Sequence, residues 1–250
     1  MKISPARSMV LVAASVVLLL IIWEAASSIV NADIILPTPF AVLRRLIAIG
    51  DRRTFFRHIA ASGERVAVSF LFSLIVGILL GIGSGLSSAF RAFLSPFVHT
   101  MRTVPVMAVI LIAILWFPST VVPIFAAVLM ALPVVIGAVE RGILEIDSKL
   151  VEMAHIFRVP PVERLRRVII PQLVPSILTA AHLTLGLCWK VVVAGEIFTI
   201  PRSGVGAQMQ LAQLSLESEA VFAWTVVVVI SAALSQALLS LADHFGKRSS

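Results

Sequence analysis

The residues of this chain that could do chemistry are a few charged side chains set within long apolar runs. Arg102, Lys190 and Glu196 interrupt such runs, and Trp189 stands beside Lys190. A lysine or arginine at the bilayer centre costs about 2.5–3.5 kcal/mol on insertion scales, so it usually faces water or a partner. These four residues are therefore candidates for a polar pathway through a membrane. For Arg102 two interpretations stay open: a cationic lining for an anionic solute, or a side chain that extends to the lipid interface.

Catalytic and metal chemistry find little support in the same sequence. Cys188 is the single cysteine, which excludes an internal disulfide and a cysteine-based metal site. His, Asp and Glu residues do not occur at spacings typical of a metal site. A phosphate-binding G-x-x-x-x-G-K-[ST] loop is missing from the sequence. Ser73, Ser84 and Ser231 have no suitably spaced base, so we expect no cofactor, no metal and no enzymatic activity in this chain.

The composition places the chain in a membrane. Of its 250 residues 59% are hydrophobic and 13% are charged, whereas a soluble domain has about 25% charged residues. No water-soluble fold could bury so much apolar surface. The net charge of +7 is spread over short loops, which fits membrane topology and contact with anionic lipids rather than a nucleic-acid surface. The expected fold class is therefore an all-α polytopic membrane protein.

Six membrane spans follow from the apolar runs, since a bilayer core needs about 20 apolar residues per helix. The expected spans are Met9–Val30, Val66–Leu86, about Pro96–Phe117, about Thr120–Val139, about Ile177–Phe198 and about Val221–Leu241. They form one transmembrane domain over residues 1–250, with a core at about 60–245. Six spans put both termini on one side, and the larger number of lysines and arginines on that side indicates the cytoplasm.

The N-terminal region allows two interpretations. Residues 1–30 are expected to form the first span, and residues 31–65, which mix apolar residues with arginines, a helical segment in the outer interface. Alternatively, residues 1–30 are a signal peptide that is cleaved near Ala25–Ser27. The cytoplasmic placement of the later loops is the same in both cases.

A basic connection between the fourth and fifth spans covers about residues 140–173. It contains "VEMAHIFRVPPVERLRRVIIPQLVP", residues 151–175. Two short helices, Leu150–Phe157 and Val162–Ile170, fit this stretch, because Pro160 and Pro161 end the first of them. Helices of this length are not stable alone in water, so each needs a surface on which to lie.

This connection resembles the cytoplasmic loop of binding-protein-dependent ABC importer permeases. The family's motif reads E-A-A, three residues, G, nine residues, I-x-L-P. Three groups of positions align with it and keep its spacing: Glu152, Met153 and Ala154, then Arg158, and finally Val168, Ile170 and Pro171. Met153 replaces an alanine, and Arg158 replaces the glycine that usually permits a tight turn. The adjacent prolines are expected to supply the break instead.

Three further stretches resemble the nitrate, sulfonate and taurine branch of these permeases. They are "LPTPFAVLRRL" (36–46), "MRTVPVMAVILIAILWF" (101–117) and "LCWKVVVAGEIFTIPRSGVGAQM" (187–209). The resemblance implies a permease subunit in a bacterial inner membrane with both termini cytoplasmic. It implies a second permease copy, cytoplasmic ATP-binding subunits that hold the loop, an extracytoplasmic solute-binding protein, and a small anion such as nitrate, sulfonate or taurine as solute.

Two other classes of function stay open. A self-contained secondary transporter or channel would often show inverted repeats and matching broken helices, and neither is visible. A membrane-embedded enzyme would need a nucleophile with a base, or a metal cluster, at membrane depth. Neither alternative explains the basic connection at residues 151–175.

Overall fold

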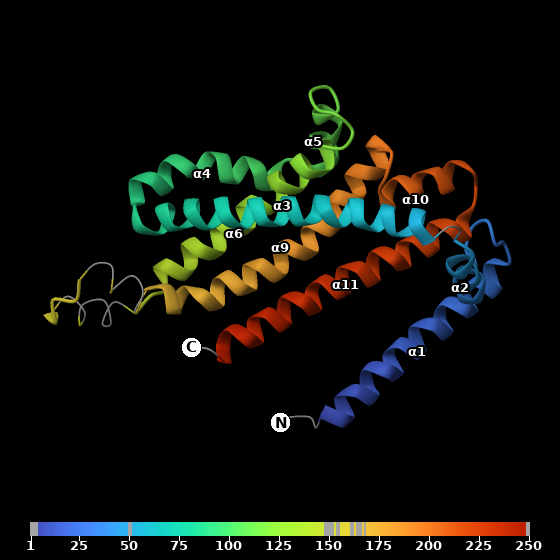
Figure 1. Ribbon diagram of the computed structural model, residues 1–250, viewed down its shortest axis with the longest axis horizontal. Coiled ribbons are helices and arrows are strands. Elements are labelled where there is room, and N and C mark those ends of the chain that lie inside the picture. Colours follow the sequence, from blue (N-terminus) through green and yellow to red (C-terminus); the bar gives the residue numbers. More distant parts are fainter. Residues whose placement is uncertain are drawn as a thin grey trace.

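The computed structural model describes residues 5–49, 52–147, 153, 156–160, 163, 167 and 169–248. Its long elements are all helices, and no strand occurs in these ranges. In chain order they are α1 (Pro5–Val30), α2 (Pro39–Ala48), α3 (Arg52–Leu86), α4 (Ser88–Thr103), α5 (Val106–Ala113), α6 (Val122–Leu144), α9 (Ile170–Thr199), α10 (Val205–Leu214) and α11 (Ser218–Arg248). Figure 1 shows the longest ones side by side. The predicted all-α fold class is confirmed.

Among the described residues, five helices are long and apolar enough to cross a bilayer, and α4 with α5 makes a sixth if the bent pair counts as one span. The pair bends by 94°, where a single third span was expected. Pro105 explains the break, because proline lacks an N–H and forces the preceding residue out of the helical region. Val104 accordingly has an extended backbone with ψ 127°.

The segment after the first span differs from the expectation at its end. Thr38 accepts a hydrogen bond from the Ala41 N–H at 3.1 Å and starts α2, which has Pro39 in its first turn. The next helix, α3, begins at Arg52 and continues to Leu86. Residues 52–65, which were expected to belong to a separate interfacial segment, are continuous with the second apolar helix in α3.

Helices α3, α6 and α9 form the packed centre of the bundle. Gly77, Gly81 and Gly85 recur every four residues on the face of α3 that touches α6. A Cβ on Gly77 would lie 2.6 Å from Val135, and one on Gly81 would lie 2.7 Å from Val139. Small residues at this spacing let two membrane helices approach closely. This close packing fixes the position of α3 relative to α6, and with it the positions of the polar residues on both helices.

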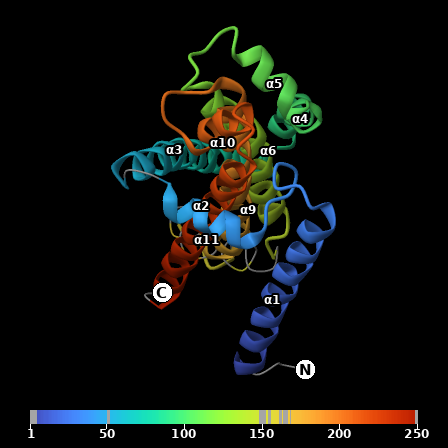
Figure 2. The same ribbon diagram turned by 90° about the vertical axis from the view of Figure 1, so that its right-hand side faces the viewer.

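The first helix stands apart from this centre. In Figures 1 and 2, α1 meets the rest of the chain near its C-terminal end. There the Trp23 indole N–H donates to the Pro37 carbonyl at 3.0 Å, and the Ser27 hydroxyl donates to the Leu36 carbonyl at 2.8 Å. No residue of its most apolar 18-residue stretch is buried within the chain. In Figure 2 the free ends of α1 and α11 lie at the same end of the molecule.

Candidate functional site

The four predicted pathway residues do not form one site. Arg102 lies on α4, whereas Trp189, Lys190 and Glu196 lie on α9. Trp189 is buried, and its indole N–H donates to the Ser235 hydroxyl of α11 at 2.9 Å. Lys190 is exposed on the other side of the helix, and no described residue pairs with it. Lys190 and Glu196 therefore lie on different sides of α9.

Glu196 is fully buried in an ion pair with Arg65 of α3, with Arg65 Nη1 2.5 Å from Glu196 Oε1. The Ser62 hydroxyl donates to the same carboxylate at 2.8 Å, and the Gly206 N–H donates to it at 2.9 Å. Both carboxylate oxygens therefore have partners. Buried charges are usually paired and hydrogen-bonded in this way. Glu196 thus exposes no surface in this structure, whereas the sequence analysis expected it to line a pathway.

The chain after α9 wraps around this ion pair. The Val205 N–H donates to the Ser62 hydroxyl at 2.8 Å, and the Gly204 N–H donates to His58 Nδ1 at 3.1 Å. A Cβ on Gly204 would lie 2.7 Å from the Glu196 carboxylate, so only glycine fits there. The ion pair thus holds the start of α10 against α3 and α9.

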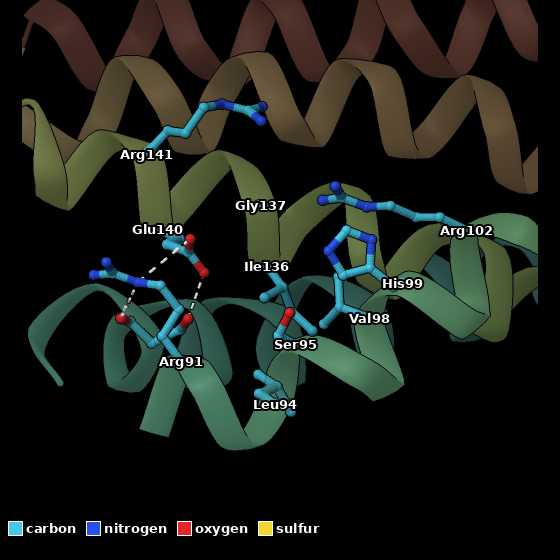
Figure 3. A pocket seen from close by; sticks show the side chains of 11 residues that line it. Arg91, Leu94, Ser95, Val98, His99, Arg102, Ile136, Gly137, Glu140 and Arg141 are labelled. Carbon is cyan, nitrogen blue, oxygen red and sulfur yellow. Dashed lines mark hydrogen bonds and ion pairs between the residues drawn. The ribbon is translucent and has the colours of Figure 1, made fainter. Parts of the chain in front are cut away.

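A pocket of about 180 Å³ lies between α3, α4 and α6, towards the ends of α3 and α6 at Leu86 and Leu144. Figure 3 shows its lining. The charged and polar side chains there are Ser84, Arg91, Ser95, His99, Arg102, Glu140 and Arg141. Apolar side chains complete the wall: Leu94, Val98 and Ile136. Arg102 is thus the predicted pathway residue that borders a pocket of this kind in the described chain.

At one end of the pocket the Glu140 carboxylate is held by neighbouring side chains. Arg91 Nε lies 3.5 Å from Glu140 Oε1, and the Ser84 hydroxyl donates to Glu140 Oε2. Arg91 also donates to the Ser84 carbonyl at 3.1 Å and the Gly85 carbonyl at 3.3 Å. These contacts join the end of α3 to α4 and α6.

At the other end of the pocket two arginines converge. Arg102 Nη2 donates to the Pro133 carbonyl of α6 at 3.0 Å. A Cβ on Gly137 would collide with Arg102 Nη2 and would lie 3.8 Å from Arg141 Nη1. In Figure 3 both side chains extend towards Gly137 from opposite directions. The missing side chain at Gly137 leaves room for both guanidinium groups.

The connection between α6 and α9 is described at some of its motif positions. The Phe157 N–H donates to the Met153 carbonyl at 3.0 Å, which is one helical turn. Arg158 follows with φ 52°, a left-handed conformation. Ile170 and Pro171 are exposed and begin α9. Glu152, Ala154 and Val168 lie outside the described residues. Arg158 itself makes the turn that was expected of Pro160 and Pro161.

Sequence reasoning missed the partners of these groups. The sequence alone suggested no partner for Arg65, Arg91 or Arg141. Arg65 stands 131 positions before Glu196 in the chain, and no short-range pattern connects them. An arginine and a glutamate inside otherwise apolar helices were a signal that each needed a partner.

Comparison with known proteins places this architecture. The profile of the family described as "Binding-protein-dependent transport system inner membrane component" matches residues 73–250. A putative aliphatic sulfonates transport permease of Bacillus subtilis is 30% identical over 89% of this chain and 81% of its own length. The taurine transport system permease of Escherichia coli is 30% identical, over 87% of this chain and 81% of its own length.

A nitrate import permease of Leptolyngbya laminosa is 32% identical over 63% of this chain and 56% of its own length. Among solved structures, the MetNI methionine ABC transporter in an inward-facing conformation has a similar fold. The TM-score is 0.58 at 16% identity, over 76% of this chain and 96% of that one. The chain therefore belongs to the family of binding-protein-dependent transport system inner membrane components, the permeases of ABC importers.

Proposed function

We propose that this chain forms the solute pathway of an ATP-driven importer of small anions, and that the connection between α6 and α9 couples it to cytoplasmic ATPase subunits. The observation that carries the coupling role is the exposed apolar surface of that connection. Met153, Ile156 and Phe157 are 49%, 71% and 74% exposed. Exposed apolar side chains beside charged ones are typical of a surface that a partner covers.

The position of the connection suits it for transmitting movement. It joins α6 to α9, and these helices pack against each other, for example where Gly142 of α6 meets Leu173 and Ser176 of α9. Because packed helices move as units, a displacement of the connection acts on both. ATP binding and hydrolysis then belong to the partner subunits, and this chain is no enzyme.

The motif positions add a second support. In the family motif Arg158 stands at the glycine position, and its φ of 52° is one that glycine adopts without strain. The backbone at Arg158 is therefore compatible with the glycine of the family motif. We assign the ATPase contact to Glu152, Met153, Ala154, Arg158, Val168, Ile170 and Pro171.

The pathway itself lies between two permease copies in this proposal. Lys190 is exposed on a membrane helix and has no partner among the described residues. Such a charge is costly against lipid. A water-filled pathway or a second copy beside α9 removes that cost. An extracytoplasmic binding protein delivers the solute, and the names of the relatives favour a sulfonate, taurine or nitrate.

The proposed orientation puts both termini and the connection in the cytoplasm. It is tested with single cysteines at positions 164 and 202 in a Cys188→Ser background. An impermeant thiol reagent applied to intact cells is expected to label position 202 and not position 164. Labelling of position 164 reverses the orientation.

The coupling role is tested by co-expressing the chain with the ATPase encoded beside it and reconstituting the complex in proteoliposomes. We expect ATP-dependent anion uptake and co-purification of the ATPase. Phe157→Ala is expected to weaken co-purification. Leu216→Ala is the matched control, because Leu216 is 71% exposed but lies beyond α10, between α10 and α11. Uptake that needs no ATP, or equal co-purification in both variants, contradicts the proposal.

A further inference from the structure

We propose that the pocket between α3, α4 and α6 binds the transported solute, and that it selects an organic anion with an oxyanion head and a short apolar tail. This inference rests on the proposed function, because it assigns the site at which the permease holds its solute.

The positive charge of the pocket exceeds its negative charge. Glu140 is the one carboxylate among its lining residues, and Arg91 and Ser84 already bind it. Arg102 and Arg141 have no carboxylate partner anywhere in the described chain. Two cationic side chains are therefore left over on one side of the pocket.

These two cations approach each other instead of separating. Both guanidinium groups lie close to Gly137, and Arg102 is held there by its hydrogen bond to the Pro133 carbonyl. Like charges at short range repel, most strongly where the dielectric constant is low. An anion bound between them attracts both guanidinium groups and offsets this repulsion. Arg102 and Arg141 are both exposed, so an oxyanion can reach both guanidinium groups from the same side.

The hydrogen-bonding capacity matches a planar or trigonal oxyanion. A guanidinium has five N–H donors in a rigid fork, and Arg102 uses one nitrogen for Pro133. The remaining donors of Arg102 and Arg141 can bind two or three oxygens at once, as arginine does with carboxylate and phosphate. Figure 3 shows His99 next to Arg102, where its ring adds a further polar group.

The apolar part of the pocket lining selects the tail of the solute. Leu94, Val98 and Ile136 form an apolar wall beside the cationic end. The volume of about 180 Å³ corresponds to about six water molecules at roughly 30 Å³ each, which suits a solute of a few carbon atoms. A second, ammonium group finds no free carboxylate there, because Glu140 is bound to Arg91. The pocket therefore favours an alkanesulfonate over taurine, and also over nitrate, which has no tail.

The position of the pocket fits the inner part of the route. Its residues lie near Leu86 and Leu144, where α3 and α6 end, and Leu144 directly precedes the connection to α9. With that connection in the cytoplasm, the pocket lies in the inner half of the membrane. We place it as the site that the solute occupies before release.

The test measures binding to the purified full chain in detergent by titration calorimetry. The probes are sodium 1-propanesulfonate, taurine and nitrate; 1-propanesulfonate has a methyl group where taurine has its ammonium. We expect 1-propanesulfonate to bind at least fivefold more tightly than taurine or nitrate. Equal affinities overturn the selectivity, and no binding of any probe overturns the site.

Variants then locate the binding. Arg102→Gln and Arg141→Gln are expected to weaken 1-propanesulfonate binding at least tenfold. Arg57→Gln is the matched control, because Arg57 is exposed on α3 outside the pocket, and its affinity is expected to stay within twofold. Arg102→Lys keeps the positive charge. Binding by this variant shows that the loss in Arg102→Gln comes from the missing cation and not from misfolding. If Arg102→Gln and Arg141→Gln bind like wild type, the site is wrong.

Uptake in the reconstituted complex separates the two proposals. If the wild-type complex takes up no anion with ATP, the proposed function fails. If ATP-dependent uptake is present but Arg102→Gln and Arg141→Gln leave its rate and its half-saturating concentration unchanged, the function stands and the pocket fails. A half-saturating concentration raised at least tenfold in both variants, with Arg57→Gln unchanged, supports both.

Discussion

The buried Arg65–Glu196 ion pair and the pocket between α3, α4 and α6 contain the same residue types but differ in burial and in charge balance. Arg65 and Glu196 are buried, and every oxygen of the carboxylate is bound. In the pocket Arg91 and Glu140 are 34% and 25% exposed, and two further arginines have no acid partner in the described chain. Burial and satisfied hydrogen bonds mark a structural pair, whereas accessible, unbalanced cations mark a surface that can bind a ligand.

The largest expected effect comes from breaking the ion pair between Arg65 and Glu196. Glu196→Gln leaves Arg65 buried without a counter-charge, and removing one partner of a buried pair costs about 3–5 kcal/mol. We expect a lower unfolding midpoint in detergent and less protein in the membrane. Glu217→Gln is the control, because the Arg45–Glu217 pair is exposed, and such pairs contribute about 0–1 kcal/mol.

A companion variant sharpens that result. Adding Arg65→Gln to Glu196→Gln removes the stranded charge, so we expect part of the lost stability to return. A Glu196→Gln protein that unfolds at the wild-type midpoint shows that the ion pair does not hold α10 against α3 and α9.

The next effect concerns Glu152, at the head of the motif. Glu152→Ala is expected to leave the abundance of the permease unchanged, because the residue lies outside the predicted spans. Truncating one partner of a buried charge pair at an interface costs about 2–5 kcal/mol, so ATPase association and uptake should fall sharply. Glu163→Ala is the control, since Glu163 is exposed and pairs with Arg167 at 3.9 Å. Normal uptake with the ATPase fully bound excludes this coupling contact.

The sequence predicted the elements better than the contacts between them. Apolar length located the spans, since the cost of exposing polar groups to lipid acts on each segment separately. The break at Pro105 could have been predicted from the sequence, because a proline at the start of an apolar run interrupts the helix before it. The meeting of Arg102 with Gly137 and of Arg65 with Glu196 depends on how α3, α4, α6 and α9 pack. No local pattern encodes that packing.

A smaller effect is expected in the pocket between α3, α4 and α6. Glu140→Gln removes a partly exposed carboxylate, so we expect a stability loss of about 1 kcal/mol or less, well below that of Glu196→Gln. It also removes the negative charge of the pocket, and the affinity for 1-propanesulfonate should rise about threefold. Calorimetry and thermal unfolding of the same samples measure both quantities. A destabilisation equal to that of Glu196→Gln would make the Arg91–Glu140 pair structural as well.

The smallest expected effect is at Arg158. A non-glycine residue in the left-handed region costs about 1–2 kcal/mol, and Arg158 has φ 52°. Arg158→Gly relieves that cost but gives the unfolded chain more freedom, which offsets about 0.5–1 kcal/mol. The net change is small, so we expect normal abundance, normal ATPase binding and uptake within twofold of wild type.

Arg158→Val is the opposite test, because a β-branched side chain tolerates positive φ least. We expect it to distort the turn after Phe157 and to reduce both ATPase binding and uptake. Leu216, with φ 59°, is the matched site in the connection between α10 and α11, where Leu216→Val should leave ATPase binding unchanged. If Arg158→Gly abolishes uptake at normal abundance, the arginine side chain itself contacts the ATPase, and the backbone conformation is not what the coupling segment requires at this position.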